Sequence, residues 1–154
     1  MTTMARGPHF SARTTLGFRE CAELLRRKLE AEGFRVVSEV DFRREFEKSS
    51  GLTWRNYTVF VVWSPFYAFQ ALISDQEYGG LFIPFNLVIA EDSQTTLLAV
   101  ADYPLGSGLA ESRIGIQVLV RELQRKIRQI ILELRNQEPT RVHAALEHQR
   151  KEAV

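Results

Sequence analysis

Residues 111–135, ESRIGIQVLVRELQRKIRQIILELR, form the segment that decides the fold. Their apolar side chains recur at steps of three and four, which places them on one face of an α-helix. A helix of this length would be about 37 Å long at about 1.5 Å per residue, enough to cross a small β-sheet. The segment therefore predicts one long covering helix, whose apolar seam consists of Ile116, Val120, Leu123, Ile127, Ile130 and Leu134.

A second amphipathic helix is predicted over residues 17–34, GFRECAELLRRKLEAEGF. Gly17 can begin it, and Gly33 is a natural C-terminal stop. Its apolar face contains the only cysteine of the chain, Cys21, which we therefore expect to be buried and unreactive. The other members of that face are Phe18, Ala22, Leu25 and Leu29.

The chain between the two long helices is rich in strand patterns. Strands are predicted over residues 9–16, 34–42, 56–63, 81–90 and 95–101, the last two joined by a hairpin. Residues 56–63, NYTVFVVW, are apolar on both faces, which predicts something packed on each side. Residues 43–54 are interpreted as a connection, with one helical turn at most. A short helix follows Ser64, its predicted cap, and begins at Pro65.

This order of elements favours the α+β class. We expect an antiparallel sheet of about four to five strands, with two long helices on one face and a short helix between strands. Residues 1–8 are predicted to be a loose lead-in, residues 9–135 a single domain, and residues 136–154 a polar C-terminal extension.

The composition and charge of the chain limit the classes of function that we expect for it. The 154 residues include 20 Lys and Arg against 19 Asp and Glu, without the basic excess of a dedicated nucleic-acid binder. No apolar run approaches the roughly 18 residues that span a membrane. A lone cysteine fits a reducing compartment. We therefore expect a cytoplasmic protein without nucleic-acid or membrane partners.

The stretch NYTVFVVWSPFYAFQALISDQEYGGLFIPFNLVIAED, followed by LLAVADYP, resembles the core of the bacterial and archaeal family called domain of unknown function 302. The GFRECAELL helix and the EGFRV turn also match, so the resemblance covers about residues 14–135. The matching residues of the core are Tyr57, Pro65, Ala68, Ala71, Leu72, Asp75, Gly80, Leu81, Pro84, Asn86, Asp102 and Pro104.

The resemblance implies a TBP-like or helix-grip-like α+β fold and favours a homodimer, but it brings no assigned function. Family members often carry cysteines where this chain has Trp63 and Phe85, and Ser64 replaces their usual asparagine. These departures weaken any thiol, metal or redox role that the resemblance would suggest.

Pro84, Phe85 and Asn86 interrupt an apolar run, and proline cannot donate to a sheet ladder. We expect a break or bulge in the ladder there, with Asn86 directed to the covered face of the sheet. Asn86 would then satisfy a freed backbone group; alternatively, the bulge would aim it into a pocket.

Aromatic residues are concentrated between Tyr57 and Phe85, and we expect most of them in the core. The alternative is an aromatic ligand groove or a dimer face. Phe66, Tyr67 and Phe69 share one short helix and cannot all point inward, which predicts some exposed aromatic surface.

Few polar residues are candidates for a binding or metal site. Arg121, Arg125, Arg128 and Arg135 form a stripe opposite the apolar seam, interpreted as a solvated face with an anionic partner as the alternative. His9, His143 and His148 lack the spacing of a metal pair and are expected on the surface. No catalytic set, cofactor site or metal site is predicted.

Two functions remain open. The first is a non-catalytic, dimeric binding module for a small apolar ligand or a partner protein, with Tyr57, Trp63, Phe85, Asn86 and Asp102 as candidate ligand-binding residues. The second is a redox or sulfur-metabolism accessory protein, or an enzyme, with a site near the Pro84–Asn86 kink that uses Asp41, Tyr57, Asn86 and Asp102.

Overall fold

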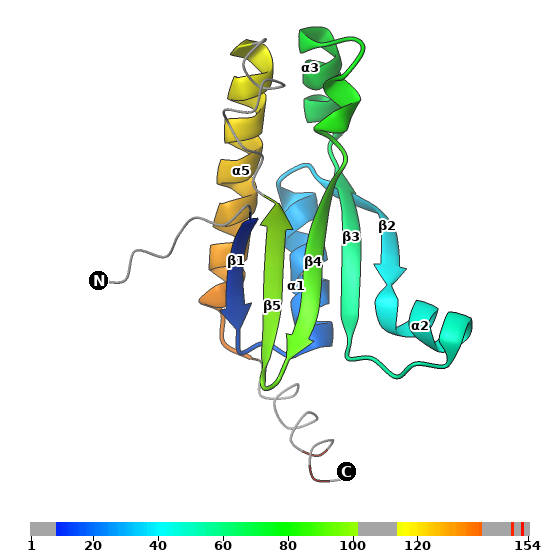
Figure 1. Ribbon diagram of the computed structural model, residues 1–154. Helices are drawn as coiled ribbons and strands as arrows, with labels where there is room; N and C mark the ends of the chain where they lie inside the picture. The colour runs from blue at the N-terminus through cyan, green and yellow to red at the C-terminus, as the bar shows by residue number, and fades with distance from the viewer. Residues whose placement is uncertain (1–8, 102–113, 140–148, 150–151, 153–154) are drawn as a thin grey trace.

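A five-stranded antiparallel sheet forms the frame of the computed structural model, which describes residues 9–101, 114–139, 149 and 152 (Figure 1). The strands lie in the order β1-β5-β4-β3-β2, so β4 is central and β1 and β2 are the edges. The sheet, with its helices, confirms the predicted α+β class. The strands are β1 (His9–Thr14), β2 (Arg35–Asp41), β3 (Tyr57–Trp63), β4 (Phe85–Asp92) and β5 (Thr95–Ala101).

The two long helices lie together behind the sheet, as Figure 1 shows. They are α1 (Phe18–Ala31) and α5 (Ile114–Arg135); the predicted start of α5 at residues 111–113 lies outside the described residues. The shorter elements are α2 (Phe42–Ser50), α3 (Pro65–Ser74) and the 3₁₀ turn η1 (Gly79–Leu81). None of the helices within the described residues is both long enough and apolar enough to cross a membrane.

The core lies between the sheet and the two long helices. All six residues of the predicted α5 seam are buried, which confirms that prediction. Alternate strand residues such as Phe60, Leu87 and Leu98 face them. Each fully buried side chain of this kind contributes about 1.5–3 kcal/mol relative to exposure. Two buried hydroxyls join the layers: Thr14 Oγ1 donates to the carbonyl of Leu134 at 2.9 Å, and Thr96 Oγ1 to that of Leu16 at 2.8 Å.

The end of α1 explains how the chain turns back into the sheet. Gly33 has a φ of +82°, a left-handed conformation that favours glycine. Its N–H donates to the carbonyl of Glu30 at 3.0 Å, and the Phe34 N–H donates to that of Leu29 at 2.9 Å. This is the Schellman pattern, in which buried Leu29 and Phe34 supply the accompanying apolar contact. The predicted stop at Gly33 is confirmed.

The connection predicted over residues 43–54 is wrong for most of its length, because α2, which runs from Phe42 to Ser50, occupies eight of those residues. Asp41 caps it, its Oδ1 accepting from the Arg44 N–H at 3.1 Å, and Gly51 ends it at a φ of +66°. None of its residues is buried, and its apolar side chains are only Phe42 and Phe46, one helical turn apart. The cap and the glycine stop were the available signals.

The prediction that β3 is covered on both faces is also wrong for the described residues. Thr58, Phe60 and Val62 are buried, whereas the opposite side chains, from Tyr57 to Trp63, are only partly covered. None of the described helices covers the centre of that open face, although Phe42 of α2 packs on Tyr57 at 4.9 Å. The apolar residues of the open face are therefore half exposed rather than buried.

The strand predicted over residues 81–90 begins later, at Phe85. Residues 79–81 form η1, and the Ile83–Pro84 peptide bond, which is cis, lies just before β4. Pro84 thus removes no hydrogen bond from the ladder, and β4 is a central strand without a bulge at this point. The register irregularity of the described sheet lies instead between Val36 and Ser38 on the edge strand β2.

The short helix α3 projects beyond the strands and lies beside the N-terminal part of α5 (Figure 1). Pro65 begins it as predicted, but the buried Ser64 hydroxyl makes no capping hydrogen bond. A side chain at Gly79 would overlap the backbone at Ala71, and one at Gly115 would overlap the Ser74 side chain. The two glycines therefore allow η1 and α5 to approach α3 closely.

The environment of Cys21 predicts an inert thiol. Cys21 is fully buried, and burial, with Glu20 beside it, raises the pKa of the thiol from 9.0 to about 12. Since the thiolate is the reactive form, a thiol reagent at pH 8 should label the native protein far more slowly than the urea-unfolded protein. Fast native labelling would contradict the burial.

Because the folded state retains the Cys21 thiol proton to a higher pH than the unfolded state does, the thiol should reduce the free energy of unfolding as the pH rises from 9 towards about 12.

Candidate functional site

Of the described residues predicted to form a ligand site, three lie on one face of the sheet and the fourth lies on the opposite face. Trp63 and Tyr57 lie on the open face of the sheet, and exposed Asn86 shares that face because it pairs with Val61. Phe85 points to the covered face. Asp102 lies outside the described residues. The prediction that Asn86 faces the covered side is therefore wrong: β4 begins at Phe85, and the alternation along the strand turns the next side chain outward.

Phe85 belongs to an aromatic group inside the core. Its ring meets that of Phe34 edge-on at 6.0 Å, and the Phe34 ring stacks on Tyr67 at 5.7 Å. Beside Phe85 is a crevice of about 20 Å³. That space suits about one water molecule rather than an organic ligand. The crevice is lined by Phe85, Val100, Ala101, Leu123, Gln124, Ile127 and Arg128.

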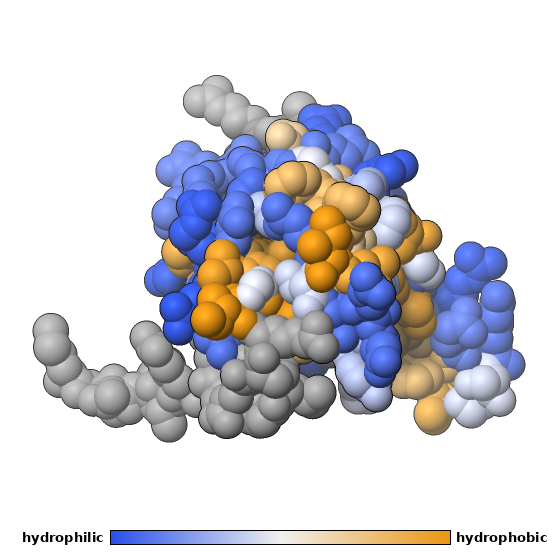
Figure 2. Space-filling model, turned by 90° about the horizontal axis from the view of Figure 1, so that it is seen from above, coloured by the Kyte–Doolittle hydropathy of each residue, from blue (hydrophilic) through white to orange (hydrophobic). Residues whose placement is uncertain are grey.

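Apolar side chains gather at the end of the molecule where α3 meets the start of α5. Figure 2 looks onto this end, where apolar residues group near the middle of the face and polar residues border them. Phe66 and Phe69 are 61% and 67% exposed, which confirms the prediction of exposed aromatic surface. We call this surface the apolar tip: Phe66, Phe69, Leu72, Ile73, Tyr78, Leu81, Ile114 and Val118.

Tyr67 holds the apolar tip in place. It is the inward member of the three aromatic residues of α3, only 2% exposed, and its hydroxyl donates to Glu122 Oε1 at 2.9 Å. Burial, followed by this hydrogen bond, raises the pKa of the Tyr67 phenol. The Lys126 ammonium lies 5.6 Å from the centre of the Tyr67 ring. These contacts fix α3 against α5 and direct Phe66 and Phe69 outward.

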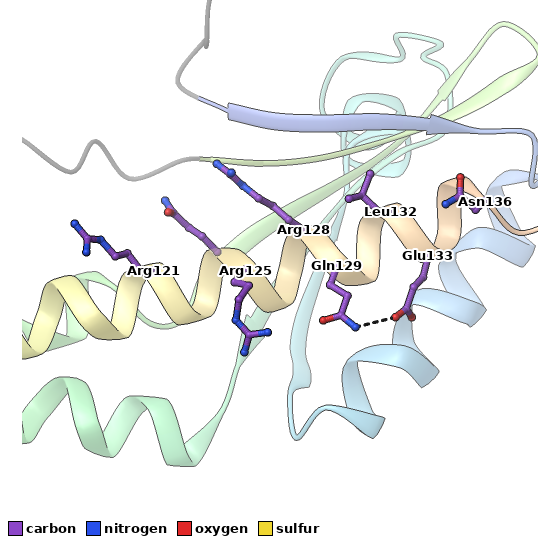
Figure 3. A pocket seen from close by; sticks show the side chains of 8 residues that line it. Arg121, Arg125, Arg128, Gln129, Leu132, Glu133 and Asn136 are labelled. Carbon is purple, nitrogen blue, oxygen red and sulfur yellow. Dashed lines mark hydrogen bonds between the residues drawn. The ribbon is translucent and has the colours of Figure 1, made fainter.

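A second surface feature follows the outer side of α5. Here a shallow trough of about 480 Å³ runs along the helix. Figure 3 shows Arg121 and Arg128 extending to one side of α5 and Arg125 to the other, while Gln129 donates to Glu133 at 3.2 Å. We call it the α5 trough, lined by Arg121, Gln124, Arg125, Arg128, Gln129, Leu132, Glu133 and Asn136.

The described residues offer little to the chemistry of the redox or enzymatic alternative. No group of three or more potential metal ligands occurs within them. Asp41 is engaged in capping α2. His9 is exposed, as predicted, whereas His143 and His148 lie outside the described residues. The other features of the described surface are the apolar tip and the α5 trough.

Sequence reasoning found parts of both surfaces. The arginine stripe anticipated the α5 trough except for Arg135, which does not line it. The three aromatic residues of α3 indicated the apolar tip. The contributions of Tyr78, Leu81 and Val118 were missed, because they come from separate segments that only the packing of α3 and η1 on α5 brings together.

Comparisons with known proteins agree with this architecture. The model of the family described as "Domain of unknown function DUF302" matches residues 10–134. The crystal structure of an uncharacterized conserved protein DUF302 from Bacillus stearothermophilus is similar, with a TM-score of 0.74 and 18% identity over 83% of this chain and 98% of that one. This similarity shows a shared fold. None of the curated proteins matches this chain.

The position of Asn86 yields a stability prediction. Because its side chain is exposed on the open face, Asn86→Ala should change the free energy of unfolding by no more than about 0.5 kcal/mol. Asn86→Asp should be equally mild. Urea denaturation of both variants measures the change, and a loss of about 1–3 kcal/mol would indicate instead a buried hydrogen-bonding role.

Proposed function

The chain belongs to the family described as Domain of unknown function DUF302, and we propose that it is a non-catalytic, cytoplasmic binding module that pairs with a second copy of itself. The observation that carries the proposal is the apolar tip. Its exposed side chains come from α3, the η1 region and α5, and α3 packs against both of the other two. Large apolar patches on proteins commonly mark interaction sites.

The size of the apolar tip fits one half of a protein interface. A large side chain that is about half exposed presents roughly 100 Å², so the eight side chains of the tip present roughly 800 Å². The largest apolar patch on a typical monomer is about 300–600 Å². A standard interface takes about 800 Å² from each partner. The summed exposed area of the apolar tip is therefore comparable with the area that a standard interface takes from one partner.

Its composition favours a second copy over a different partner. The α3 sequence, PFYAFQALIS, contains no charged residue, so it offers no charge pattern that would select a partner of opposite sign. An uncharged apolar surface can match itself across a two-fold axis, the commonest symmetry of protein dimers. Interfaces of permanent homodimers are also the more apolar class.

The alternatives gain less support from the described residues. A small apolar ligand would need a pocket of about 300–1,000 Å³, whereas the crevice beside Phe85 offers about 20 Å³. A redox role would need a reactive group, and the Cys21 thiol is buried with its pKa raised to about 12. A protein partner at the apolar tip therefore remains the function that the geometry supports best.

The dimer is tested by replacing the two exposed aromatic residues of α3. We expect wild-type protein at micromolar concentration to scatter light as twice the chain mass of 17.7 kDa. The variant Phe66→Ser with Phe69→Ser should raise the dissociation constant at least about 30-fold, since central aromatic residues commonly contribute about 2 kcal/mol or more to an interface. Analytical ultracentrifugation measures the constant.

Leu52→Ser provides a matched control, because Leu52 is 59% exposed in the loop after α2, away from the apolar tip. This variant should dimerise like the wild type. Circular dichroism establishes that all variants are folded. A wild-type monomer, or a dimer that the Phe66 and Phe69 replacements leave intact, would refute the proposed interface.

A further inference from the structure

We propose that the α5 trough is a binding site for a small organic anion that carries two or more phosphate groups. The inference is independent of the dimer, since the residues of the trough are distinct from those of the apolar tip. It rests on uncompensated positive charge, on the spacing of the arginines and on the polar groups that accompany them.

Two arginines of the trough, Arg121 and Arg125, carry charge that no ion pair within the described residues balances. No carboxylate among the described residues forms an ion pair with Arg121 or Arg125. The acidic side chains nearby are already engaged: Glu122 accepts from Tyr67 at 2.9 Å, and Glu133 pairs with Lys28 at 3.0 Å. The trough therefore presents an excess of positive charge to solvent.

Glu133 is the one acidic residue that lines the trough, and its contacts limit its effect. The Lys28 ammonium, together with the Gln129 amide, lowers the pKa of the Glu133 carboxyl. The carboxylate stays ionised, but Lys28 on α1 neutralises its charge locally. An anion near Arg121 and Arg125 would lie toward the other end of the trough, two to three helical turns from Glu133.

The spacing of the arginines suits more than one phosphate. Arg121 and Arg125 are four residues apart, about 6 Å along the axis, and Arg128 lies about 10 Å from Arg121. The three fall within about a quarter turn, yet Figure 3 shows their side chains spreading to both sides of α5. Each guanidinium can hold phosphate oxygens with two parallel hydrogen bonds. Two linked phosphate groups would therefore meet Arg121 and Arg125 at a spacing that a single phosphate cannot span.

One wall of the trough is preorganised. The Arg128 guanidinium lies 5.1 Å from the centre of the Phe10 ring on β1, a cation–π arrangement that restricts the side chain. Arg128 and Gln124 also line the crevice beside Phe85, so they stand where α5 meets the sheet. A restricted arginine loses less conformational entropy on binding an anion than a free one does.

The remaining lining suits an organic molecule rather than a bare ion. The amides of Gln124 and Asn136 can donate and accept hydrogen bonds, which can orient a polar ligand. The exposed side chain of Leu132 adds an apolar contact. A volume of about 480 Å³ lies within the range of small-molecule sites, about 300–1,000 Å³.

The test uses inorganic pyrophosphate as the probe, titrated into the full chain by calorimetry in about 50 mM salt. We expect saturable binding to the wild type, and a loss of affinity of at least about 10-fold in Arg121→Gln with Arg125→Gln, since the double variant removes charge-assisted hydrogen bonds, which are the stronger class. Glutamine preserves helix propensity. The matched control is Arg19→Gln with Arg27→Gln, which removes the same charge from exposed positions on α1 and should stay within about two-fold of the wild type.

Four outcomes would overturn the proposal. They are no binding of millimolar pyrophosphate to the wild type, equal loss in the α1 control, inorganic phosphate binding as tightly as pyrophosphate, and tighter binding of a single-stranded oligonucleotide or of vesicles with anionic lipid. The last would assign the surface to a polyanion. Should the double variant fail to fold by circular dichroism, Arg121→Gln alone replaces it and should weaken binding at least about three-fold.

Discussion

The apolar seam of α5 on the covered face of the sheet is the contact on which the rest of the structure depends. Its buried residues run from Ile116 to Leu134, and they meet strand residues such as Leu87 together with the α1 side chains Leu25 and Leu29. At the C-terminal end of the seam, the Thr14 hydroxyl donates a hydrogen bond to the Leu134 carbonyl, which joins the edge strand β1 to the last turn of the helix. A substitution within the seam would open a cavity between all three elements at once, since closely packed interiors relax only partly around a lost side chain.

The same helix brings the two candidate surfaces together. Its inward side forms the core, its first turns contribute Ile114 and Val118 to the apolar tip, and its outer side carries the arginines of the α5 trough. Tyr67 and Glu122 connect α3 to this helix, so the apolar tip has a rigid support. The two proposed binding surfaces thus lie on the helix layer and its end, whereas the open face of the sheet carries the partly buried residues of β3 and the exposed Asn86.

At Pro84, local backbone chemistry excluded one residue from the sheet, whereas strand pairing decided where β4 begins. Proline correctly indicated that the ladder could not include residue 84, because it lacks an N–H. The position of the break within the apolar run depended on where β4 could pair with β3, and that pairing begins at Phe85. One residue of offset is enough to exchange the two faces of a strand, which is why Phe85 is buried and Asn86 is exposed.

The sequence by itself determined the long helices, the α+β class, the stop at Gly33, the burial of Cys21 and the outward aromatic residues of α3, because each depends on local periodicity or local backbone chemistry. It also displayed the arginine stripe. Only the tertiary structure decided that the second face of β3 is open, that Phe85 and Asn86 lie on opposite faces of the sheet, and that Arg121 and Arg125 have no acidic partner among the described residues. Those outcomes depend on which distant segments of the chain pack together. The pattern of residues within one segment does not specify which other segments will contact it.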